Sequence, residues 1–72
     1  MTTIRYALPE ASRVVLKVYD ILGREVATLV EGRQQAGLRE AIFDAAHLPS
    51  GMYVYRIEAA GQIHTGRVLL LK

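Results

Sequence analysis

Apolar and polar side chains alternate in the first part of the chain, with the period of two that a half-buried β-strand produces. Ile4, Tyr6 and Leu8 recur at every second position until Pro9, which cannot donate a backbone hydrogen bond to a sheet. The alternation returns at residues 14–19, where apolar side chains face one way and a lysine marks the solvent side. Both segments are therefore predicted to be strands.

Three further segments extend this pattern. Residues 24–30 favour a strand, although the same residues would also form about two turns of helix. Residues 38–44 predict a strand that turns Ala41 and Phe43 inward. Residues 53–57 are β-branched and aromatic, and Tyr53, Tyr55 and Ile57 share one face.

The expected connections are a tight turn from Asp20 to Gly23, a polar loop at residues 31–37, a connection at residues 45–51 with Leu48 tucked beneath it, and a hairpin at Gly61.

The last expected strand, residues 63–72, becomes wholly apolar at residues 68–71. A run that is apolar on both faces is expected to be covered on both faces. A homodimer joined at sheet edges is one way to supply that cover. With short strands and turn signals at roughly 8 to 12 residues, the fold class predicted is all-β: a small immunoglobulin-like antiparallel β-sandwich of six or seven strands.

Composition limits how this sandwich is stabilised and what it binds. The chain has 72 residues and no cysteine, so a single small core has to stabilise it without disulfides. Its net charge of +2 is small and scattered, which argues against nucleic-acid binding. The first residues lack the apolar run of a signal peptide, and no segment approaches the ~20 apolar residues of a membrane span, so we expect no membrane insertion.

Candidate catalytic side chains are few, and we expect no enzyme activity, no cofactor and no metal site. Ser50 lies in a proline–glycine turn, where bonding to its own backbone is the ordinary role of a serine. Asp44 and His47 supply two metal ligands at most, fewer than a structural zinc needs, and the alternative is a turn-capping aspartate beside an exposed histidine. The remaining candidates are Ser12, Asp20 and His64.

Tyrosine side chains raise the question of carbohydrate binding, because aromatic rings on a β-sandwich can stack on sugars. Tyr6, Tyr53 and Tyr55 fall on faces that we assign to the core, where a buried ring with a bonded hydroxyl is expected. Tyr19 is the best exposed candidate. Core packing therefore accounts for most of the tyrosines.

Three segments together resemble a known family. They are TTIRYALPEAS at residues 2–12, VVLKVYDILGREVATLV at residues 14–30, and LPSGMYVYRI at residues 48–57. In these segments the chain is similar to the C-terminal sorting domains of proteins exported by the type IX secretion system, the Por secretion tail family. That family is related to the immunoglobulin-like domain of the flagellar hook-capping protein. The turn residues that match the family motifs are Asp20, Gly23, Pro49, Gly51 and Tyr53.

The resemblance implies a function that composition alone does not. Residues 1–72 would be a single, non-catalytic C-terminal sorting domain excised from a larger secreted protein. Type IX components would recognise it in the periplasm and carry the linked passenger across the outer membrane to the cell surface or the extracellular space. In this family a sortase-like protease usually removes the domain and can attach the passenger to the surface. The family ends in an apolar strand with a final basic residue, so the implied recognition residues are Arg67, Val68, Leu69, Leu70, Leu71 and Lys72.

Two other functions fit the same fold. One is an architectural immunoglobulin-like domain that spaces or assembles an extracellular enzyme. The other is a carbohydrate-binding module, for which Tyr19 would be the contact residue.

Overall fold

The computed structural model describes residues 2–71 and contains strands, turns and no helix in that range. In β1, β2 and β5 the most buried residues are apolar and lie at alternate positions, as the sequence pattern predicts. No helix within the described range is long and apolar enough to span a membrane. The six strands are β1 (Thr2–Leu8), β2 (Ser12–Asp20), β3 (Glu25–Gln34), β4 (Gly37–Phe43), β5 (Gly51–Ala59) and β6 (Gln62–Leu70).

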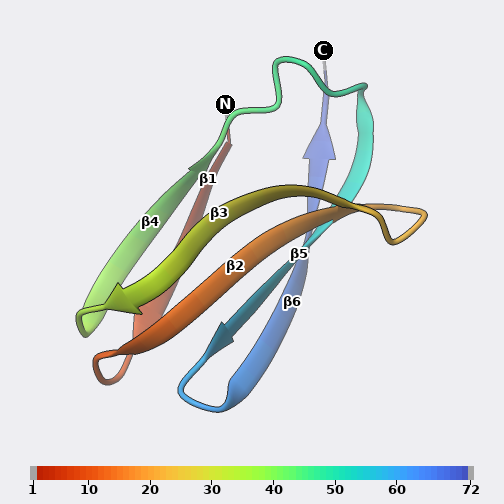
Figure 1. Cartoon of the computed structure of the whole chain (residues 1–72). Helices are drawn as coiled ribbons and strands as arrows, with labels where there is room; N and C mark the ends of the chain where they lie inside the picture. Colours follow the sequence, from red (N-terminus) through yellow and green to blue (C-terminus); the bar gives the residue numbers. More distant parts are fainter. Residues whose placement is uncertain (1, 72) are drawn as a thin grey trace.

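The strands form two antiparallel sheets that pack face to face (Figure 1). The smaller sheet contains β1 and β4, and the larger has the order β3-β2-β5-β6. The chain therefore changes sheets after β1, after β3 and after β4. This arrangement confirms the predicted fold class, a small antiparallel β-sandwich with six strands.

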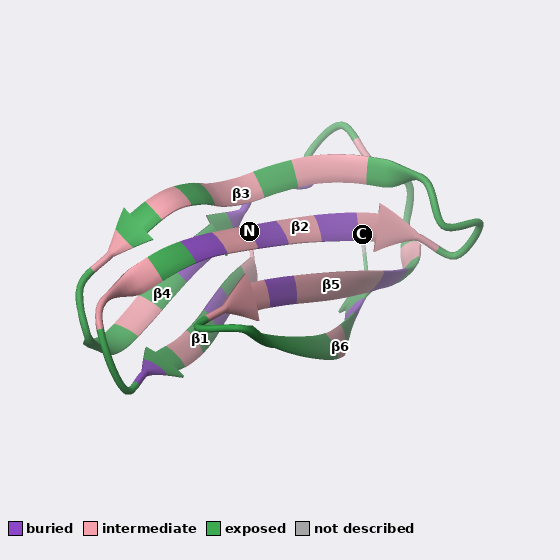
Figure 2. Ribbon diagram, turned by 60° about the horizontal axis from the view of Figure 1, so that its bottom comes forward, coloured by how far each residue is buried: buried purple, intermediate pink, exposed green. Residues whose placement is uncertain are grey.

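The core lies between the two sheets. From the larger sheet, the alternate β2 residues Val14, Leu16 and Val18 are fully buried. From the smaller sheet, Phe43 is buried against them and Ala41 lies beside it, as predicted. Figure 2 shows the resulting alternation of buried and less buried residues along β2. Because there is no disulfide, this inner layer has to provide most of the stability.

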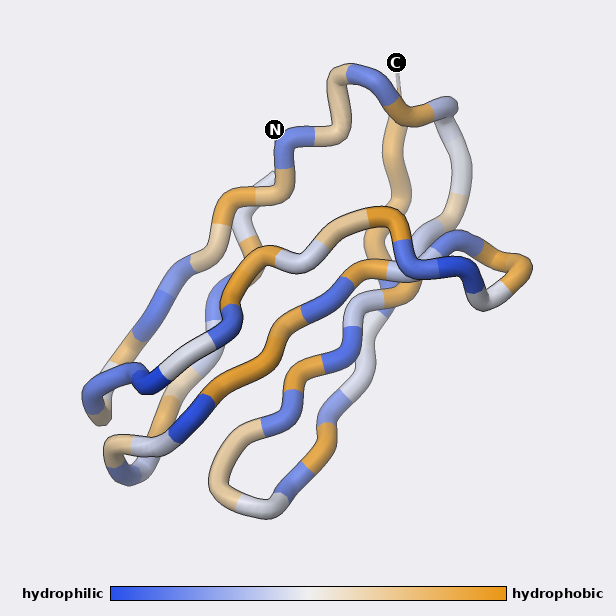
Figure 3. Tube along the Cα trace, in the orientation of Figure 1, coloured by the Kyte–Doolittle hydropathy of each residue, from blue (hydrophilic) through white to orange (hydrophobic). Residues whose placement is uncertain are grey.

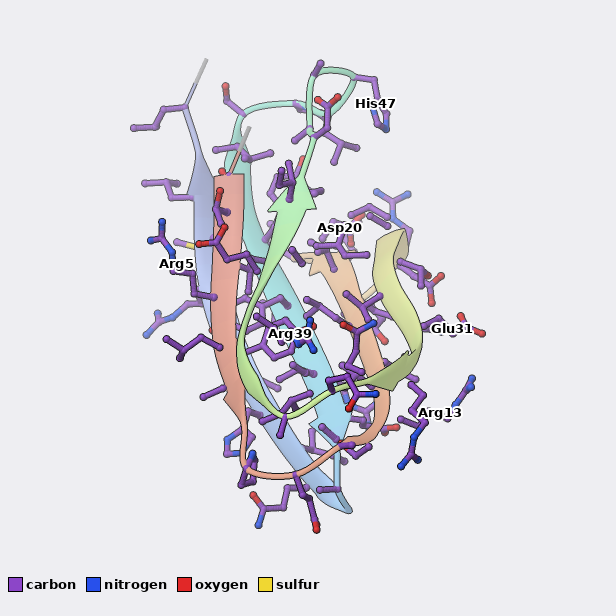
Figure 4. The ribbon with its side chains drawn as sticks, turned by 90° about the vertical axis from the view of Figure 1, so that its left-hand side faces the viewer. Arg5, Arg13, Asp20, Glu31, Arg39 and His47 are labelled. Carbon is purple, nitrogen blue, oxygen red and sulfur yellow. The ribbon has the colours of Figure 1, made fainter. Side chains whose placement is uncertain are left out.

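The prediction of a polar loop at residues 31–37 is wrong for most of that range. β3 continues to Gln34, and only residues 35–36 separate it from β4. The polar segment pairs with the start of β2, where Arg13 Nη2 lies 3.7 Å from Glu31 Oε1 (Figure 4). An edge strand can carry polar side chains on its solvent face, so hydrophobic patterning could not reveal that the strand extends this far. The segment does lead from one sheet to the other, as expected.

A two-stranded sheet does not cover all of a four-stranded one. At the β5–β6 turn, the inner face of β6 presents Gln62 and His64, and both are exposed. At the other end of the same strand, Val68 and Leu70 are buried. The smaller sheet therefore covers β6 at the end of the sandwich where this strand finishes, and not at the β5–β6 turn.

Candidate functional site

Of the recognition residues implied for the tail, Arg67 to Leu70 lie on β6, an edge strand of the larger sheet, and Leu71 directly follows it. Among the described strands, β6 is hydrogen-bonded only to β5. Its register places Arg67 opposite Val54 and Val68 opposite Tyr53. Lys72, the last of the implied residues, lies outside the described residues.

The two faces of this tail differ, which corrects the expectation that both would be covered. Val68 and Leu70 are 7% and 8% exposed and belong to the core. Leu69 and Leu71 are 57% and 81% exposed. The smaller sheet covers only the inner face of the larger one, so nothing within the described chain packs over the outer face of β6. One set of side chains in this apolar run therefore packs in the core, and the alternate set is exposed to solvent.

The β2–β3 turn is fixed by Asp20. Its Oδ1 accepts hydrogen bonds from the backbone N–H of Leu22 (2.9 Å) and of Arg24 (3.0 Å). Its Oδ2 accepts one from Nε of Arg24 at 2.8 Å (Asp20 is labelled in Figure 4). The bond from the Arg24 backbone is the main cause that lowers the pKa of the Asp20 carboxyl, and the Arg24 side chain contributes further. Gly23 has φ of 84°, a left-handed conformation that favours glycine, so both motif residues shape the turn as predicted.

The connection before β5 is held by two further motif residues, Pro49 and Tyr53. The Tyr53 hydroxyl donates a hydrogen bond to the carbonyl oxygen of Pro49, at 2.8 Å. The Tyr53 ring is buried and meets Phe43 edge to face, with ring centroids 6.2 Å apart. Leu48 packs partly buried against the core, in the position expected for it. This tyrosine thus ties the connection to the centre of the sandwich.

Strand pairing brings the turn motif at Asp20, the start of β5 and the tail together at one end of the larger sheet. Asp20, the first residue of the turn motif, pairs with Tyr53 of β5, and Tyr53 pairs in turn with Val68 of the tail. One position earlier on β5, Met52 lies opposite Leu69. Sequence patterns indicate a local role for each motif but no strand order, so their convergence is visible only in the structure.

Gly66 and Tyr55 form a contact that sequence reasoning missed. The two residues are opposite each other on β6 and β5, and the Tyr55 ring lies where a side chain on Gly66 would be. An aromatic ring over a glycine on a neighbouring strand is a known way to stabilise an edge. The sequence does contain one indication of this contact, because a glycine inside a strand often marks the close approach of another group.

Asp44, one of the two candidate metal ligands, acts as a structural group. Asp44 Oδ1 accepts a hydrogen bond from the backbone N–H of Ala46 at 3.2 Å, and His47 is exposed on the connection that follows (Figure 4). This is the turn-capping role that the sequence offers as the alternative to a metal site. Within residues 2–71, no group of three or more histidine, cysteine or acidic residues is close enough to hold a metal ion.

The tyrosines do not form an exposed platform in the structure. Tyr53 is buried, and Tyr6 and Tyr55 pack partly buried against the core, as predicted. Tyr19 lies between its neighbours Glu25 and Val54 and is half-buried, so it is less exposed than expected. Stacking on a sugar needs an accessible ring face, and this requirement weakens the carbohydrate-binding alternative.

A model of the family described as the secretion system C-terminal sorting domain matches residues 1–71, nearly the whole chain. We found no match among curated proteins or solved structures. The matched family consists of sorting signals for type IX secretion, and the turn motif at Asp20, the start of β5 and the tail lie together in the fold. The chain therefore belongs to the family of secretion system C-terminal sorting domains.

Proposed function

We propose that the last part of β6 and the residues that follow it are the part of this sorting domain that the type IX machinery reads. The segment runs from Arg67 to Lys72, of which the described residues end at Leu71. The observation that carries the proposal is the outward row of this tail, where Leu69 and Leu71 are largely exposed. Large apolar side chains that remain exposed next to one another mark an interaction surface, whereas scattered ones are ordinary.

The edge position of β6 supports recognition by strand addition. A strand that is paired on one side only presents backbone N–H and C=O groups on the other, and an extended segment of a partner can pair with them. In such complexes the backbone bonds give affinity, and alternate side chains give specificity. Leu69 and Leu71 are the alternate side chains available here.

The domain would act as the C-terminal, non-catalytic part of a larger exported protein. The N- and C-termini of the domain lie on the same side of the sandwich (Figure 1), so a passenger joined ahead of β1 would emerge beside the tail. In this proposal the type IX components bind the domain in the periplasm and move the passenger across the outer membrane. A sortase-like protease then removes the domain and leaves the passenger attached to the surface or released outside the cell.

The direct test is binding of the purified domain to purified type IX outer-membrane components. Deletion of residues 67–72 is a poor variant, because Val68 and Leu70 belong to the core. The double variant Leu69→Ser/Leu71→Ser changes only outward side chains. We expect it to bind about 30-fold more weakly, the effect of losing an interface hot spot.

Ile63→Ser is the matched control for that variant. Ile63 lies on the same strand and the same face as Leu69, and it is 54% exposed compared with 57% for Leu69. Circular dichroism should show that every protein is folded. Equal binding by wild type, Leu69→Ser/Leu71→Ser and Ile63→Ser would contradict the proposal and favour an architectural domain.

A further inference from the structure

The tip of the β2–β3 turn is apolar and almost fully exposed. Ile21 is 75% exposed and Leu22 is 72% exposed. The geometry of the turn depends on Asp20 and Gly23, and it uses the backbone N–H of Leu22 but neither apolar side chain. Residues at such a tip are usually polar or glycine. Because exposed side chains add little to folding, the isoleucine and leucine need another explanation.

These side chains are continuous with the outer side of the tail. A groove of about 540 Å³ is lined by Ile21, Leu22 and Met52, and Met52 lies opposite Leu69 on β6. Figure 3 shows the orange tip of the turn beside the blue residues that frame it, and the orange end of β6. We call Ile21, Leu22, Met52 and Leu69 the motif-end patch. It extends the exposed apolar surface from the edge strand towards the turn motif.

Charge around the motif-end patch is almost balanced. Arg24 is paired with Asp20 at 2.8 Å, and Lys17 with Glu25 at 2.9 Å. Arg67, which precedes Leu69 on β6, is exposed and forms no ion pair within residues 2–71. Among the described residues, the border of the patch therefore carries one uncompensated positive charge, and a complementary partner would place a carboxylate there.

We propose that the motif-end patch is the second half of the docking surface for the type IX component that reads β6. The occupant is a folded protein surface with an apolar pocket for Ile21 and Leu22 and a carboxylate opposite Arg67. The inference rests on the proposed function, because it assigns further contacts to the same partner. It predicts that recognition depends on the turn tip as well as on the tail.

Binding of the purified type IX outer-membrane components also tests this inference. The double variant Ile21→Ser/Leu22→Ser keeps Asp20 and Gly23 and places turn-compatible residues at the tip. We expect its binding to weaken about 30-fold, as for loss of a hot spot. The control is Leu38→Ser/Ile63→Ser, which removes two exposed apolar side chains, 90% and 54% exposed, away from the patch. Its binding should match that of the wild type.

A second variant tests the inference without changing the turn. Arg67→Glu reverses the uncompensated charge, and we expect weaker binding and a smaller loss of affinity on addition of salt than in the wild type. If Ile21→Ser/Leu22→Ser and Arg67→Glu both bind like the wild type while Leu69→Ser/Leu71→Ser does not, the inference is overturned and the proposed function stands. If the folded wild-type domain does not bind, both are overturned.

A second copy of the chain is the competing occupant of the patch. Light scattering at high protein concentration separates the two cases. We expect the wild type and Ile21→Ser/Leu22→Ser to have the same mass. A wild-type dimer that the double variant converts to a monomer, with binding to the type IX components unchanged, would assign the patch to self-association and overturn the inference.

Discussion

On the last strand of the sandwich, Val68 and Leu70 are 7% and 8% exposed, whereas Leu69 and Leu71, their neighbours in the chain, are 57% and 81% exposed. The chemistry of the two sets is nearly the same, and only the alternation of the strand separates them. The inner pair stabilises the fold, and the outer pair contributes little to it. The difference teaches that folding and recognition use alternate residues of one segment, so mutation can separate them.

Substitution on the two faces of β6 should produce the largest contrast. Leu70→Ala removes buried methyl groups and leaves a cavity, so we expect the free energy of unfolding to fall by about 2–5 kcal/mol. In a domain of this size that loss can abolish the cooperative transition. Leu69→Ala should change the free energy by less than about 0.5 kcal/mol. Urea denaturation measures both, and equal losses would contradict the division between the faces.

Gly66→Ala should have the next largest effect. The new methyl group would collide with the Tyr55 ring, and overpacking of this kind costs about 1–3 kcal/mol. Combining Gly66→Ala with Tyr55→Ser should cost less than the sum of the two single changes, because the ring is no longer there to collide. Thr65→Ala, on the neighbouring outward position, is the control. Additive free energies of unfolding would show that the ring does not limit residue 66.

Asp20→Asn tests whether the carboxylate of Asp20 stabilises the β2–β3 turn. Hydrogen bonds from Arg24 hold the pKa of Asp20 below its ordinary value of about 3.9. The carboxylate therefore stabilises the fold above that ordinary value, and this contribution is lost as the pH falls through the lower pKa of the folded protein. We expect the wild type to lose more stability than Asp20→Asn between pH 7 and pH 2. Urea midpoints at both pH values measure this, and identical losses would contradict the role of the carboxylate.

Ile21→Ser/Leu22→Ser should have the smallest effect on stability. The two side chains are mostly exposed, so the free energy of unfolding should remain within about 0.5 kcal/mol of the wild type. The same variant is expected to lose binding, which would sharpen the separation between folding and recognition. A thermal melt with a clearly lowered midpoint would instead show that the turn tip supports the fold.

Local alternation made much of the fold predictable from the sequence. The inward positions of Val14, Leu16, Val18 and Phe43 follow from a period of two, and all are buried. The turn at Asp20 and the connection before Tyr53 were identified from residues with a mechanical role in turns. These features depend on neighbours in the chain, which is why a single sequence reveals them.

Features that depend on the partner strand were missed. The polar end of β3 reads as a loop because an edge strand needs no apolar residues there. The run at residues 68–71 is apolar throughout, so its pattern does not say which side chains are covered. The contact of Gly66 with Tyr55 and the position of Met52 opposite Leu69 require the β5–β6 register. The motif-end patch depends on the same information.

Secretion of a reporter tests the central claim most directly. A fluorescent protein joined ahead of residues 1–72 would be followed in a host with a working type IX system, with the export of each fusion measured as the fraction outside the cell. We predict export of the wild type and of Ile63→Ser, and retention of a folded Leu69→Ser/Leu71→Ser fusion in the periplasm. Export of that double variant at the wild-type level would contradict recognition through the outward face of the tail.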